Sequence, residues 1–170
     1  MPKPIRLYVR WIDAINRFVG RFAMYLLFAL GAVLLYSTAS RVFLGAPVNW
    51  SLEMSQFLLS AYYLLGGAYS LQMDSHVRMD LLYSRFSPRQ KAITDVFTIA
   101  FVIFYLVVLL RGGLSSTEYA ITYNQVNYTA WAPPLWPIKS IMTLGIFLML
   151  LQMISQFFKD LALALDRPIA

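Results

Sequence analysis

The chain has 170 residues, of which 59% are hydrophobic and 13% are charged. A soluble domain usually has about 25% charged residues, so this composition predicts burial in lipid or against other proteins. The sequence contains no cysteine and one histidine. These counts exclude disulfides, thiolate metal sites and bis-histidine haem ligation by this chain alone.

The first predicted element is a helix over residues 5–21. Its apolar residues recur at steps of three and four, and its arginines fall mainly on the other side. An arginine-rich amphipathic helix that carries Trp11 is typical of a segment lying in the headgroup region of an anionic leaflet. The alternative is a helix that packs on another protein surface.

The first membrane-spanning helix is expected over residues 22–41. No side chain from Phe22 to Ser40 is charged, and Arg41 ends the run. The run is longer than the roughly 7–15 apolar residues of a secretory signal, so we expect a retained span rather than a cleaved one. A short connection rich in glycine and proline follows it.

The second span is expected over residues 53–73. Trp50 and Glu53 mark one edge, and no side chain between Met54 and Met73 is charged. Some 20 helical residues, each rising about 1.5 Å, cover a hydrocarbon core roughly 30 Å thick. The residues of this stretch therefore predict a crossing of the membrane.

Two neighbouring glycines, Gly66 and Gly67, lie in the second half of this span. Small residues let helix backbones approach closely within lipid, which favours a helix-packing face here. Ordinary glycine content of membrane helices is the alternative. At the opposite edge the chain becomes polar, with His76 and Arg78 between two aspartates.

The third and fourth spans are expected over residues 93–111 and 138–158. The third is expected to end at Arg111, which two glycines follow. The segment between these spans is rich in tyrosine and tryptophan and includes Trp131 and Trp136. Such side chains favour the membrane–water boundary, because an apolar ring carries a polar tip.

The distribution of lysine and arginine predicts the orientation. Eleven of them precede the first span, lie in the 74–92 loop or follow the fourth span, whereas three lie on the other side. The positive-inside rule places the side with eleven, and with it both termini, in the cytoplasm. Because the positive charges are concentrated on one side of the membrane, the net charge of +6 is explained by topology, and no nucleic acid is needed as a partner.

The expected fold is therefore an all-α integral membrane protein with four transmembrane helices and an N-terminal amphipathic interfacial helix. Residues 1–170 are expected to form one membrane domain. We expect Arg41 and Glu53 to form an ion pair at the outer edge of the first two spans, with Trp50 packed at the same level.

The predicted spans contain few side chains that could take part in catalysis or ion transport. None of the four spans has an ionisable group near its middle, where such groups usually mark ion or proton paths. His76 is the only residue of its type, and a lone histidine in a basic loop is more often structural than catalytic. Asp74 and Asp80 beside it offer only a loose site for a divalent ion. We therefore expect no enzyme activity, no metal site and no cofactor.

These features, in this order, resemble the small membrane subunit of tripartite ATP-independent periplasmic (TRAP) transporters, the DctQ-like proteins. The likeness covers nearly the whole chain. Four places carry it: Arg41 at the end of the first span, the Trp50–Glu53 opening of the second, the Asp74–Asp80 exit with His76 and Arg78, and the Trp131–Pro137 segment before the fourth.

The resemblance implies a role in a transporter of a bacterial or archaeal cytoplasmic (inner) membrane. In such systems a large multi-span subunit carries the substrate and sodium sites, and a soluble periplasmic substrate-binding protein delivers the substrate, typically an organic acid. The small subunit supports the large one and helps dock the binding protein. The residues that we expect to serve structure or partner contact are Arg41, Trp50, Glu53, Gly66, Gly67, His76, Arg78, Trp131 and Trp136, with membrane lipids as further contacts.

Two alternatives stay open. One is a stand-alone four-span carrier, which would need an ionisable residue in mid-span. The other is the small subunit of a membrane redox complex, which would need more histidines, cysteines or paired carboxylates.

Overall fold

The computed structural model describes residues 3–73 and 88–164. All four elements in these ranges are helices: α1 (Lys3–Leu44), α2 (Ser51–Gln72), α4 (Pro88–Thr122) and α5 (Trp136–Ala164). The predicted all-α class is therefore confirmed. His76 and Arg78 lie outside the described residues.

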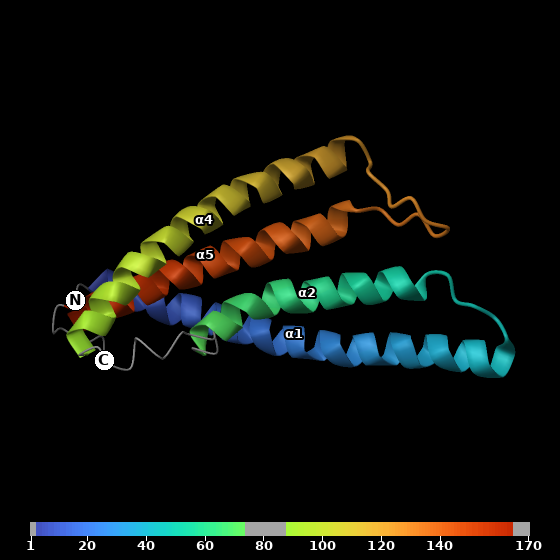
Figure 1. The fold of residues 1–170 in the computed structure, drawn as a ribbon, viewed down its shortest axis with the longest axis horizontal. Helices are drawn as coiled ribbons and strands as arrows, with labels where there is room; N and C mark the ends of the chain where they lie inside the picture. The colour runs from blue at the N-terminus through green and yellow to red at the C-terminus, as the bar shows by residue number, and fades with distance from the viewer. Residues whose placement is uncertain (1–2, 74–87, 165–170) are drawn as a thin grey trace.

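The helices form two antiparallel hairpins, α1–α2 and α4–α5, which pack together through α2 and α5 (Figure 1). Helix α1 also reaches α5, but only near the end of the molecule where α1 begins and α5 ends. The two hairpin connections, 45–50 and 123–135, are both at the opposite end of the molecule (Figure 1). We call the end where the start of α1 meets the end of α5 the helix-junction end. The end that contains residues 45–50 and 123–135 is called the connection end.

Helix α1 is continuous over 42 residues, about 63 Å at the helical rise. The prediction of a separate interfacial helix over residues 5–21 is therefore wrong, because these residues and the first span form one helix. Nothing between Arg21 and Phe22 breaks a helix. Residues 5–21 contact α5 of the same chain through Tyr8 and Asn16, and Val9 and Ile12 on this helix are buried. Packing of this helix on another protein stays an open alternative.

Helix α4 also exceeds the predicted span. It continues from Pro88 through Arg111 and the two following glycines to Thr122. The expected end of the span at Arg111 is therefore not a helix end, and the reason is packing: Gly113 is buried against Thr143 and Ile146 of α5. Helix α5 likewise starts two residues before and ends six residues after the predicted 138–158.

Three of the described helices are long and apolar enough to cross a membrane, over Pro4–Leu44, Phe97–Thr122 and Trp136–Ala162. Helix α2 is not among them, although its 22 residues match the predicted second span closely. Its serines, glutamines and tyrosines lower its hydropathy. These polar residues are tolerated because α2 lies between α1 and α5 and contacts both. The fourth crossing stays a prediction.

The core is built from small and branched residues at the helix crossings. Ala23, Leu65, Ala68 and Leu148 form one buried cluster between α1, α2 and α5. A second cluster joins α4 to α5 through Leu106, Ile146 and Leu150. The closest crossing is at Gly145 of α5, where an added Cβ would lie 2.7 Å from the carbonyl oxygen of Leu64 in α2. Glycine is required there because backbone meets backbone.

Candidate partner-binding surfaces

The first candidate surface is the connection between α1 and α2. Trp50 caps the start of α2 and stacks on Tyr36 of α1, with ring centroids 6.2 Å apart. The hydroxyls of Ser37 and Ser51 lie 2.8 Å apart, and Ser51 also donates to the carbonyl of Val48 at 2.8 Å. These contacts fix the short connection and leave Trp50 36% exposed.

Arg41 and Glu53 do not pair in the part of the chain that the structure describes. Arg41 is exposed in the last turn of α1, whereas Glu53 is 5% exposed in the first turn of α2. A helix dipole has its positive end at the N-terminus and its negative end at the C-terminus. Arg41 near the C-terminus of α1 and Glu53 near the N-terminus of α2 therefore each interact favourably with the dipole of their own helix. The predicted ion pair is wrong, and Oε2 of Glu53 has no hydrogen-bond partner among the described residues.

The second candidate surface is the 123–135 loop, which forms a short hairpin. The backbone N–H of Asn127 donates to the carbonyl of Pro133 at 2.9 Å, and that of Leu135 donates to Gln125 at 2.9 Å. Asn124 and Ala132 take left-handed φ values of 44° and 45° where the loop turns. The loop is therefore a defined structure rather than an irregular linker.

Side chains of α4 and α5 hold this hairpin in place. The ammonium of Lys139 donates to Oε1 of Gln125 at 2.7 Å. One turn deeper, the hydroxyls of Thr117 and Thr143 lie 2.9 Å apart, and both contact the carbonyl of Lys139. Lys139 thus joins the loop to the helices beneath it.

Aromatic side chains project from the loop. Tyr128 is 99% exposed, and both Trp131 and Trp136 are exposed, with Trp136 as the first residue of α5. A fixed hairpin with exposed aromatic residues can bind a protein surface or headgroups, since large rings give contact area at a low cost in conformational entropy.

The two glycines of α2 have different surroundings. A Cβ on Gly67 would lie 3.0 Å from Sδ of Met149, so Gly67 faces α5. A Cβ on Gly66 would meet no atom within 4 Å, because Gly66 lines an open groove between α1 and α2.

Sequence reasoning missed a buried polar cluster between α1 and α5, at the helix-junction end. Asn16 donates to Oε1 of Gln152 at 2.6 Å, and Gln152 donates to Asp13 at 3.0 Å. Lys159 forms a 2.8 Å ion pair with the other oxygen of Asp13. Asn16 and Gln152 are each 1% exposed.

The sequence contained a signal for this cluster. Asp13 and Asn16 are three residues apart, and Gln152, Gln156 and Lys159 follow one another at steps of four and three. Such spacings place polar groups on one face of each helix. The cluster is a structural joint, because its cation and its carboxylate neutralise each other and its amides bind across the interface.

Exposed apolar residues also cover the outer sides of the molecule. Helix α4 presents Phe97, Phe101, Phe104 and Tyr105, each more than 60% exposed, and α1 presents Phe18 and Phe28, each more than 70% exposed. These surfaces suit lipid or the helices of a membrane partner. Among the described residues no group of three metal-ligating side chains occurs.

One comparison with known proteins gives a match. A family model described as tripartite ATP-independent periplasmic transporters, DctQ component, matches residues 30–163. The matched range begins in the middle of α1 and includes α2, α4, the 123–135 loop and nearly all of α5. No curated protein matches the chain.

Proposed function

The chain belongs to the family of DctQ components of TRAP transporters, and on this basis we propose that it is the small supporting subunit of a sodium-coupled importer of an organic acid. Its partners are then a large multi-span transport subunit and a periplasmic substrate-binding protein. The observation that carries this proposal is the family match, because it covers the helices and the loop that form the candidate surfaces.

The exposed apolar faces support a large membrane partner. The most apolar windows of α1 and α4 are only 11% and 17% buried within the chain, compared with 33% in α5. These two outer helices therefore have the most surface left for contacts beyond the chain. We propose that the large subunit covers part of it, and that lipid covers the rest.

The connection end supports docking of the binding protein. The α1–α2 connection with Trp50 and the 123–135 loop with Trp131 lie at the same end of the bundle (Figure 1). Arg41 and Trp136 lie at this end as well. Both connections are held by hydrogen bonds, so they form a preorganised surface, which lowers the entropic cost of association. His76 and Arg78 stay proposed partner contacts from the sequence alone.

The proposal is tested by copurification. Affinity-tagged chain, coexpressed with the large subunit and solubilised in mild detergent, should retain that subunit in a defined stoichiometry through size-exclusion chromatography. An unrelated multi-span protein of similar expression level serves as the control and should be lost. Loss of the large subunit under conditions that preserve the folded chain would contradict the proposal.

Orientation is tested by single cysteines, since the chain has none of its own. We propose that the connection end faces the periplasm, because eleven of the fourteen lysines and arginines are predicted on the other side. Tyr128→Cys should react with an impermeant maleimide in intact cells. Pro4→Cys should react only after permeabilisation. The reverse pattern would refute the orientation.

A further inference from the structure

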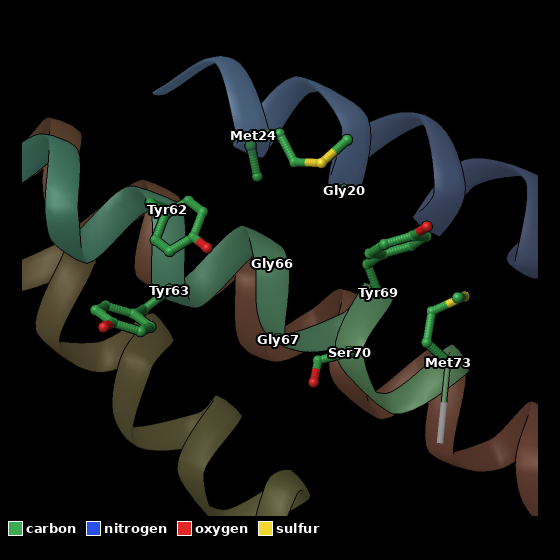
Figure 2. A pocket seen from close by; sticks show the side chains of 10 residues that line it. Gly20, Met24, Tyr62, Tyr63, Gly66, Gly67, Tyr69, Ser70 and Met73 are labelled. Carbon is green, nitrogen blue, oxygen red and sulfur yellow. The ribbon is translucent and has the colours of Figure 1, made fainter. Parts of the chain in front are cut away.

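A groove about 520 Å³ in volume lies between α1 and α2, near the C-terminal half of α2. Gly20 and Met24 line it from α1, and Tyr62, Gly66, Tyr69 and Met73 line it from α2. We call it the α1–α2 groove. In Figure 2 Gly66 lies between Tyr62 and Tyr69 along α2, opposite Met24. The groove exists because Gly66 places no side chain where its neighbours along that face carry rings.

The groove has an apolar lining and a strongly basic margin. Arg17 and Arg21 are exposed on α1. Arg17 precedes Gly20 by three residues, and Arg21 precedes Met24 by three, so both lie on the helix surface beside the groove lining. Arg6 and Arg10 continue the same row of exposed charges toward the start of α1.

We propose that the α1–α2 groove binds an acyl chain of an anionic phospholipid, whose phosphate is bound by Arg17 and Arg21. The groove runs along α2 from Tyr62 to Met73, about 16 Å at the helical rise. That length is close to half of the roughly 30 Å hydrocarbon core, the depth that the acyl chains of one leaflet occupy. The arginines are beside the part of the groove that is nearer to the predicted cytoplasmic edge of the membrane, where Gly20 faces Tyr69.

The volume of the groove, about 520 Å³, falls within the range of roughly 300–1,000 Å³ that small-molecule sites occupy. An apolar groove beside two guanidinium groups therefore matches a lipid with an anionic headgroup.

The proposal does not depend on the transporter role, and the full chain alone tests it. Chain purified in mild detergent is titrated with dioleoyl phosphatidylglycerol or dioleoyl phosphatidylcholine, and native mass spectrometry counts the bound lipids. We expect one phosphatidylglycerol to bind about 30-fold more tightly than phosphatidylcholine, given the contribution of two arginines near a membrane surface. Equal binding of the two lipids would overturn the proposal.

Two variants separate the parts of the site. Arg17→Gln with Arg21→Gln should reduce phosphatidylglycerol binding to the level of phosphatidylcholine. Gly66→Leu should weaken both lipids about tenfold or more, because its side chain would fill open space in the groove. Retained binding by Gly66→Leu would show that the lipid binds elsewhere and would overturn the proposal.

Matched controls distinguish a site from general charge and from general damage. Arg6→Gln with Arg10→Gln removes the same charge from the same row but away from the groove, and should leave the selectivity unchanged. Gly31→Leu adds the same side chain to α1 where a Cβ also meets nothing within 4 Å, and should bind lipid normally. If either control lost as much lipid binding as its matched variant, the acyl-chain site would be contradicted. The same holds if the large subunit, added in equal amount, displaced the lipid.

Discussion

Liposomes that contain this chain alone should show no sodium-driven uptake of any organic acid, whereas liposomes with all three transporter components should show it. In the sequence no span has an ionisable residue at mid-depth, and transport coupled to ions usually requires one. The polar cluster does not supply a free charge, because Asp13 and Lys159 form an ion pair with each other at the helix-junction end. We therefore expect at least a tenfold difference in initial uptake rate.

The measurement uses an imposed sodium gradient and the labelled ligand of the cognate binding protein, identified first by its effect on that protein's thermal unfolding. Omission of any one component should reduce uptake to the rate of empty liposomes. Collapse of the gradient by a sodium ionophore is the control for coupling. Uptake by this chain alone, or by the other two components without it, would contradict the supporting role.

The all-α class and the order of the four described helices were predictable because their signals are local. Uncharged runs of about 20 residues identify spans whatever they pack against. The start of α2 near Trp50 and Glu53 and the start of α5 near Trp136 were predictable for the same reason, since boundary residues mark the places where helices meet water.

The ends of α1 and α4 were not predictable, because tertiary contacts determine them. Residues 5–21 have the pattern of an interfacial helix, but their inner stripe packs on α5 and continues directly into the span. Two glycines after Arg111 suggest a helix end, but Gly113 is a close-packing position against α5. The same pattern serves lipid and protein surfaces equally well, so sequence periodicity could not separate them.

The candidate site was predictable only in part. Trp131 and Trp136 are exposed, and their role as contact residues stays a prediction. The hydrogen bond by which Lys139 holds the 123–135 loop on the helices could not be inferred from composition. The Arg41–Glu53 pair failed because proximity in sequence does not fix side-chain direction. The Asp13–Lys159 pair joins residues 146 positions apart, a separation at which one sequence gives no pairing information.

Replacing Gly145 by valine should destabilise the packing of the two hairpins by about 3 kcal/mol, the upper part of the usual range for overpacking. An added Cβ would lie 2.7 Å from the carbonyl oxygen and 2.9 Å from the carbonyl carbon of Leu64. Backbone atoms of a helix cannot move aside as a flexible side chain can, so α2 and α5 must separate. The free energy of unfolding in mixed micelles, measured by titration with a denaturing detergent, would report the loss.

Three further variants show whether this close crossing is the cause. Gly31→Val makes the same change in α1 where a Cβ meets nothing within 4 Å, and should alter stability by less than about 1 kcal/mol. Gly67→Ala meets only the flexible end of Met149 and should also be mild. Adding Leu64→Ala to Gly145→Val should not restore stability, because alanine keeps the carbonyl group and the Cβ that an added Cβ at residue 145 would meet. Rescue by Leu64→Ala would show that the outer atoms of the Leu64 side chain, rather than these atoms, make the contact that requires glycine at this crossing.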